Sequence, residues 1–150
     1  MSSRILLPVD RSEHARSACE LALELFESGT VVFLHVIDPA EASYSAETAV
    51  PNIPERWYEQ QQDRAEGHFD DLEQLVRDHG LDVERLIEAG KPAQTIVDTA
   101  RDQNIDHIVM GSHGRKGVSR LLLGSVAETV VRRSPVPVTV ARVTPAENDD

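Results

Sequence analysis

The 150-residue sequence has little cysteine and no long apolar run, and each shortage excludes a class of protein. The only cysteine is Cys19, so the chain can form neither an internal disulfide nor a cysteine-based metal site. No apolar run approaches the roughly 20 residues that cross a membrane, and the first residues do not resemble a signal peptide. We therefore expect one cytoplasmic domain over residues 1–150, with a frayed tail at 144–150.

Basic residues are also few, and lysine is the scarcest of them. There are 26 Asp and Glu residues against 15 Lys and Arg, which gives a formal net charge of −11, and only Lys91 and Lys116 are lysines. Such a charge argues against nucleic acid and against anionic membranes as partners. An acid-rich, lysine-poor surface also predicts adaptation to high salt, which would screen the self-repulsion.

Familiar catalytic motifs are missing. The sequence contains no HExxH and no Gly-x-Ser-x-Gly elbow, and its six histidines show no spacing typical of metal ligands. These absences favour a binding protein over an enzyme, but they do not exclude a slow enzyme.

Strand-like and helix-like segments alternate along the chain. The apolar or alternating runs at 4–9, 30–37, 81–89, 105–110 and 136–143 predict five strands. Helical spacing predicts four helices, at about 13–26, 56–79, 92–103 and 125–133. This order indicates an α/β fold, a five-stranded parallel open sheet with helices on both faces.

Several local features refine this prediction. The strand at 81–89 alternates in polarity and is expected nearer the sheet edge, and residues 38–54 are expected to form a long connection. Gly29 is expected just after the first helix, as its C′ residue, and Asn104 as a left-handed stop after the third. His35 is interpreted as a hydrogen-bonded core histidine rather than a ligand.

The most informative stretch runs from 108 to 131, where an apolar strand leads into a glycine-rich basic loop and then a helix. Its glycines are Gly111, Gly114, Gly117 and Gly124, and the polar residues of the loop are Ser112, His113, Arg115 and Lys116. Glycines let backbone N–H groups approach phosphate oxygens, and a helix N-terminus offers unpaired donors with partial positive charge. The stretch therefore predicts a phosphate site.

A structural alternative needs no ligand. Glycines after a strand can simply form a turn, and Ser125 with Glu128 fits a capping box at a helix start. Four glycines around one strand–loop–helix unit, with two cations inside, favour the phosphate site. The site is not a P-loop, because no Gly-Lys-Ser/Thr occurs, nor a dinucleotide fingerprint, because the first two glycines are three residues apart.

In open parallel sheets, ligands bind beyond the carboxyl ends of the strands, where the winding reverses. If the first and fourth strands flank that point, residues 8–10 face the glycine-rich loop across a crevice. An adenine would lie near Val9, Val36 and Met110, with Asp10 beside the base or ribose. The phosphates would reach Gly114, Arg115, Lys116 and the N–H groups of Ser125 and Val126, and Gly124 would allow a close approach.

The sequence resembles the ATP-binding branch of the universal stress protein family. The resemblance rests on Gly111-x2-Gly114-x9-Gly124-Ser125 and on the flanking segments 7–10, 34–38, 110–114 and 135–138, and it covers nearly the whole chain. It implies a Rossmann- or flavodoxin-like three-layer sandwich with strand order 3-2-1-4-5 that binds ATP, most often as a homodimer.

The same resemblance implies roles for individual residues. Those implied to contact the nucleoside are Pro8, Val9, Asp10 and Val36. Those implied to surround the ribose and phosphates are Gly111, Ser112, His113, Gly114, Arg115, Lys116, Gly117, Ser125, Val126 and Ala127. A Mg²⁺ or Mn²⁺ ion would be carried on the phosphates, where Asp10 could help to hold it in hydrated form.

The last predicted strand, 136–143, bears on assembly. Val136, Val138 and Val140 point one way, and Pro137 cannot donate to a ladder, which suits an edge strand. An apolar edge is hazardous unless it is paired or covered. The family resemblance implies antiparallel pairing with the same strand of a second subunit, and a protected edge in a monomer is the alternative.

Three functions are compatible with the sequence. The first is a nucleotide-dependent regulatory or stress-response protein whose conformation or partner affinity depends on bound ATP. The second is a slow ATPase or nucleotidyl hydrolase, and the missing base and metal cage weigh against it. The third is an interaction module with weak nucleotide binding, and the intact glycines weigh against that.

Overall fold

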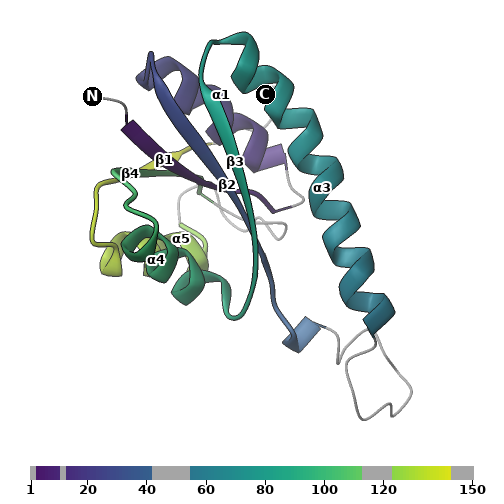
Figure 1. The fold of residues 1–150 in the computed structure, drawn as a ribbon. Helices are drawn as coiled ribbons and strands as arrows, with labels where there is room; N and C mark the ends of the chain where they lie inside the picture. Colours follow the sequence, from purple (N-terminus) through teal and green to yellow (C-terminus); the bar gives the residue numbers. More distant parts are fainter. Residues whose placement is uncertain (1–2, 11–12, 42–54, 113–122, 143–150) are drawn as a thin grey trace, which may run out of the picture.

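Five parallel strands form one sheet in the order β3-β2-β1-β4-β5 (Figure 1). The computed structural model describes residues 3–10, 13–41, 55–112 and 123–142. Its strands are β1 (Ser3–Pro8), β2 (Gly29–Ile37), β3 (Asp82–Ala89), β4 (His107–Gly111) and β5 (Val138–Ala141). Its long helices are α1 (Glu13–Leu25), α3 (Glu55–Asp78), α4 (Pro92–Asp102) and α5 (Ser125–Arg133). The predicted α/β fold and strand order are confirmed.

The helices cover both faces of the sheet, which makes the fold a three-layer sandwich. Helices α1 and α3 pack on one face, and α4 and α5 pack on the other. From β1 the chain winds outward through β2 to β3, and it then returns to place β4 on the other side of β1. The winding therefore reverses between β1 and β4, where open sheets of this kind bind ligands.

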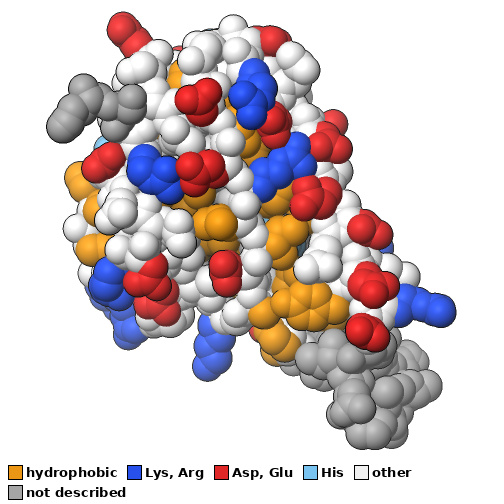
Figure 2. Space-filling model, viewed as in Figure 1, with side chains coloured by type: hydrophobic (Ala, Val, Ile, Leu, Met, Phe, Trp, Pro, Cys, Tyr) orange, Lys and Arg blue, Asp and Glu red, His pale blue; other side chains and the backbone are white. Residues whose placement is uncertain are grey.

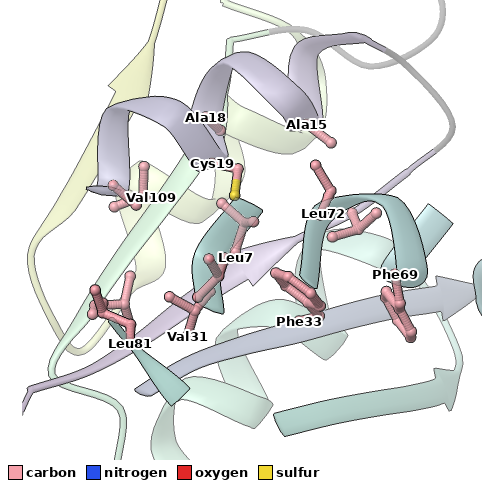
Figure 3. Packing of buried hydrophobic residues seen from close by; sticks show 14 of the residues in the cluster. Leu7, Ala15, Ala18, Cys19, Val31, Phe33, Phe69, Leu72, Leu81 and Val109 are labelled. Carbon is pink, nitrogen blue, oxygen red and sulfur yellow. The ribbon is translucent and has the colours of Figure 1, made fainter. Parts of the chain in front are cut away.

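Apolar side chains of β1, β2 and β4 fill the layer under α1 and α3 (Figure 3). The Phe33 ring of β2 stacks on the Phe69 ring of α3, with centroids 5.5 Å apart. Cys19 is fully buried in this layer, as expected of a small core residue, and burial raises the pKa of its thiol to about 12. This cysteine is therefore part of the core and is kept protonated.

Most strand and helix boundaries agree with the sequence pattern. β1 ends at Pro8, which has no N–H to donate, and β3 lies at a sheet edge as expected. Asn104 has a left-handed φ of 55° after α4. The last two strands are shorter than predicted, since β4 begins at His107 and β5 covers only Val138–Ala141.

The prediction for Gly29 was wrong. This residue begins β2 with φ of 129°, four residues after the last residue of α1 and one residue before the expected strand start. A Cβ atom there would clash with the carbonyl oxygen of Ser3, its register partner in β1. Gly29 is therefore required by a close approach between strands, and not by the end of the helix.

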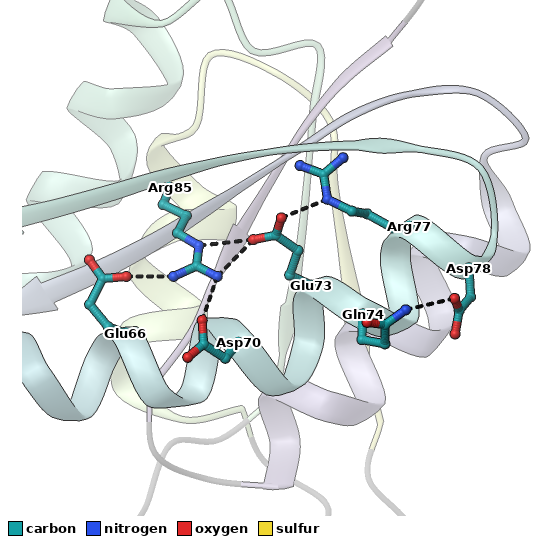
Figure 4. A network of polar contacts seen from close by, with 7 residues as sticks. All are labelled: Glu66, Asp70, Glu73, Gln74, Arg77, Asp78 and Arg85. Carbon is teal, nitrogen blue, oxygen red and sulfur yellow. Dashed lines mark hydrogen bonds and ion pairs between the residues drawn. The ribbon is translucent and has the colours of Figure 1, made fainter.

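Arginine side chains tie β3, at one edge of the sheet, to the rest of the fold. The Arg85 guanidinium contacts the carboxylates of Glu66, Asp70 and Glu73 on α3 (Figure 4). It also lies over the Phe69 ring. Figure 2 shows acidic side chains spread along α3 on the right of the view. The β3 edge is therefore strongly charged, whereas the strand at the other edge, β5, carries Val138, Thr139 and Val140.

Candidate functional site

The two ends of the glycine-rich loop are held together at the point where the winding reverses. The Gly124 N–H donates to the Ser112 carbonyl at 2.8 Å, and the Ser112 N–H donates to the Ala141 carbonyl at 3.0 Å. Ser112 itself is buried directly after β4. The end of β4 thereby fixes where α5 begins.

Among the described residues, no side chain caps the N-terminus of α5. Gly124 is the N-cap residue and makes no side-chain hydrogen bond, and Ser125 is already the first helical residue. The capping box of Ser125 and Glu128 is therefore absent, because Ser125 does not occupy the cap position. The first-turn N–H groups of a helix lack intrahelical partners, so this end of α5 can accept an anion.

The backbone conformation of Gly124 does not itself require glycine. Its φ of −67° and ψ of 163° are extended values open to any residue. A reason for glycine at this position must therefore come from what approaches it. A phosphate oxygen near the helix start is one such reason.

Gly111 is required by helix packing. A Cβ atom at Gly111 would lie 2.8 Å from the Cβ atom of His14, in the first turn of α1. The start of α1 therefore sits against the end of β4. The contact places the first turn of α1 beside the start of the glycine-rich loop.

The end of β1 is fixed by two hydrogen bonds to β2. The Val9 N–H donates to the Leu34 carbonyl at 2.8 Å, and the His35 Nδ1 atom lies 2.8 Å from the Val9 carbonyl oxygen. Because a carbonyl only accepts, His35 carries its proton on Nδ1. His35 is thus hydrogen-bonded, as the sequence predicted, but it is half-buried and not a core residue. It holds the backbone that leads to the half-buried Asp10.

The apolar residues expected near a base divide between the two faces of the sheet. Val9 belongs to the layer under α1 and α3. The residues in the layer under α4 and α5 are Val36, Met110, Val126 and Ala127. Pro8 pairs in register with Leu34, and continuing the pairing of Leu6 with Ile108 brings Pro8 beside Met110. Apolar side chains at this end of the sheet therefore gather on the α4/α5 side.

Five predicted site residues lie outside the described residues, namely His113, Gly114, Arg115, Lys116 and Gly117. In the part of the chain that the structure describes, no group of three or more His, Cys, Asp or Glu side chains is arranged to hold a metal ion. The described helices also include none that is long and apolar enough to span a membrane.

Three described residues support the site although the sequence did not assign them to it. His14 packs on Gly111, His35 holds Val9, and the Ala141 carbonyl holds Ser112. Each contact joins segments that are distant in the chain. No local motif signals such contacts, so only the fold reveals them.

Comparisons with known proteins agree on one family. The profile of the universal stress protein family matches residues 1–142. Universal stress protein MJ0577 of Methanocaldococcus jannaschii is 32% identical, with 95% of this chain and 96% of that protein aligned. The solved structure of MJ0577 superposes with a TM-score of 0.83, covering 97% of this chain and 99% of the other.

Other solved structures share the fold. UspA from Lactobacillus plantarum is 26% identical with a TM-score of 0.73, over 93% of this chain and 97% of that one. An Arabidopsis thaliana family member was solved with AMP bound, at 20% identity and a TM-score of 0.65, over 99% of each chain. Another universal stress protein was solved in complex with cAMP, at 18% identity and a TM-score of 0.64, over 95% of this chain and 98% of that one.

Proposed function

This chain belongs to the universal stress protein family, and we propose that it binds ATP and acts as a nucleotide-dependent regulatory protein. In this proposal the nucleotide lies across the carboxyl ends of β1 and β4. Its phosphates meet the N-terminus of α5, and its base meets the apolar residues Val36 and Met110. The fold relatives solved with AMP and with cAMP support an adenine nucleotide as the ligand class.

The observation that carries the proposal is the start of α5, which Ser112 holds at the switch point and which no described side chain caps. The hydrogen bond from Gly124 to Ser112 sets the first-turn N–H groups of α5 beside the end of β4. A triphosphate would supply the acceptors that these N–H groups lack within the helix. The sequence adds Arg115 and Lys116 to the same loop, and these two cations offset part of the ligand's charge.

A Mg²⁺ or Mn²⁺ ion, if the nucleotide brings one, would be carried on its phosphates. The described residues hold no group of three or more carboxylates, histidines or cysteines for such an ion, and Asp10 is the acidic residue that follows Val9 at the end of β1. Mg²⁺ commonly keeps several waters and binds through one or two carboxylates together with substrate phosphates. Asp10 suits that limited role.

Substituting Gly124 tests the site. We expect Gly124→Leu to weaken ATP binding at least tenfold in a calorimetric titration, because the new side chain would fill the space that a phosphate needs. The backbone angles at Gly124 admit leucine, so the fold should persist. Gly67→Leu is the matched control, since a Cβ atom at Gly67 meets nothing within 4 Å. Equal ATP affinity in the two variants would contradict the proposal.

We also propose that β5 pairs with its copy in a homodimer. The two edges of the sheet differ: β3 exposes Asp82, Glu84 and Glu88, whereas β5 presents uncharged, half-buried residues. Charged edge strands resist pairing with another strand, and apolar ones favour it. Charge therefore points to β5 as the edge that meets a second subunit.

One substitution tests the outward-facing backbone of β5 without disturbing the pairing of β5 with β4. The Pro137 carbonyl accepts from Ile108 of β4, and the Ala141 carbonyl accepts from Ser112, the residue after β4. Alternation therefore directs the backbone N–H of Val140 outward. Val140→Pro removes that outward donor while the bonds to β4 remain. We expect light scattering to give a dimer mass for the native chain and a monomer mass for Val140→Pro. A native monomer would contradict the proposal.

A further inference from the structure

The first turn of α4 adds a residue to the apolar surface proposed for the base. Ala93 is half-buried and packs on the same apolar layer as Val36 and Met110, between the sheet and α4/α5. The sequence predicts a base near β1, β2 and β4 only. The structure brings a fourth segment, the turn between β3 and α4, to the same side of the sheet.

The position of this turn is fixed by the end of β2. The Gly90 N–H donates to the carbonyl of Ile37, the residue after Val36, at 3.0 Å. Gly90 has φ of 152°, and a Cβ atom there would lie 2.7 Å from the Thr95 hydroxyl oxygen. Lys91 follows and accepts a hydrogen bond from the Thr95 N–H at 2.9 Å, which closes the first turn of α4. Ala93 is therefore held beside the carboxyl end of β2 by backbone contacts.

We propose that Ala93 determines how much room the base has on this surface. This inference rests on the nucleotide-binding function proposed above and names a specificity-determining residue for it. A flat purine ring between Met110 and the start of α4 would face a methyl group at position 93. A longer side chain there would project into the space that the ring needs. The small size of Ala93 is then a requirement of the ligand.

A larger side chain at position 93 should weaken ATP binding, whereas a larger side chain at position 94 should not. We expect Ala93→Leu to reduce ATP affinity about tenfold or more, the range that one misplaced group causes in a shaped apolar site. Gln94→Leu is the matched control, because Gln94 lies in the same turn of α4 and is exposed. Circular dichroism and thermal midpoints establish that each variant is folded, and Ala93→Val replaces Ala93→Leu if the larger residue prevents folding.

Hydrogen exchange gives a second measurement that needs no substitution. Exchange of the backbone N–H groups of residues 93–95 in the native chain should slow when ATP is added, because a base on this surface would restrict the first turn of α4. Unchanged exchange at residues 93–95, together with equal ATP affinity in the folded Ala93→Leu and Gln94→Leu variants, would overturn this inference. The proposed nucleotide-binding function would then still stand. Failure of the native chain to bind ATP would overturn the proposed function and this inference together.

Discussion

The backbone N–H of Gly124 lies 2.8 Å from the carbonyl oxygen of Ser112, although eleven residues separate the two in the chain. This hydrogen bond joins the end of β4 to the start of α5 and closes the glycine-rich loop at its base. Because Ser112 is in turn bonded to Ala141 of β5, the helix start is anchored to two strands. The proposed anion site is thus built on the rigid sheet, which favours binding because little ordering is left for the ligand to impose.

Two glycines outside the proposed site should respond to alanine in opposite directions. Gly29→Ala should lower the free energy of unfolding by about 2 kcal/mol or more, since Gly29 has a positive φ and its Cβ atom would clash with the Ser3 carbonyl. Gly67→Ala should raise it by up to about 1 kcal/mol, since Gly67 lies within α3 and its Cβ atom would meet open space. Urea unfolding measures both changes. Loss of stability in both variants would contradict this account of Gly67.

Acid should destabilise the fold through the carboxylates paired with Arg85 and Arg77. Hydrogen bonds from Arg77 and Arg85 lower the pKa of Glu73 in the folded state. The unfolded chain therefore binds a proton at a higher pH, near the ordinary glutamate value of about 4.3. The stabilisation is complete above that value and is lost as the pH falls through the lower, folded-state pKa.

In the Glu73→Gln variant, the free energy of unfolding should fall less on acidification than it does in the native chain. The comparison is urea unfolding of native chain and variant between about pH 5 and pH 3, the range in which the unfolded-state carboxylate takes up its proton. Glu59→Gln is the control, since Glu59 is an exposed residue on the same helix. If Glu73→Gln and Glu59→Gln follow the native pH dependence equally, the Arg85 cluster does not contribute to acid stability.

Salt should stabilise the chain. A net charge of −11 on 150 residues produces self-repulsion that is relieved at molar ionic strength. Screening also weakens the exposed ion pairs, but such pairs contribute only about 0–1 kcal/mol each. We therefore expect the thermal midpoint to rise between 0.1 and 2 M KCl, and equal midpoints would contradict salt adaptation.

The sequence predicts the order and type of the elements well because local patterns determine them. Alternation of apolar strands with amphipathic helices indicates a parallel sheet, and Pro8 and Asn104 mark the ends of β1 and α4. Family resemblance supplied the strand order, which no local pattern contains. Local signals were misleading where a distant contact decides the outcome, as at Gly29, whose conformation depends on Ser3.

In the candidate site, too, the sequence predicts the features that depend on local patterns and misses those that depend on distant contacts. The glycines, Ser125 and the apolar residues at the strand ends could be selected from the sequence. The capping box could not be rejected there, because the cap position depends on the bond between Gly124 and Ser112. The contacts of His14 with Gly111 and of His35 with Val9 also join distant segments, so a one-dimensional pattern does not reveal them.

The most direct test of the nucleotide site is to identify what the native protein carries and binds. The chain is purified gently, heated to release small molecules, and analysed by mass spectrometry, and the emptied protein is then titrated with ATP. We predict ATP at close to one molecule per chain, or saturable ATP binding when none is retained. Absence of any nucleotide together with no measurable ATP binding would contradict the account.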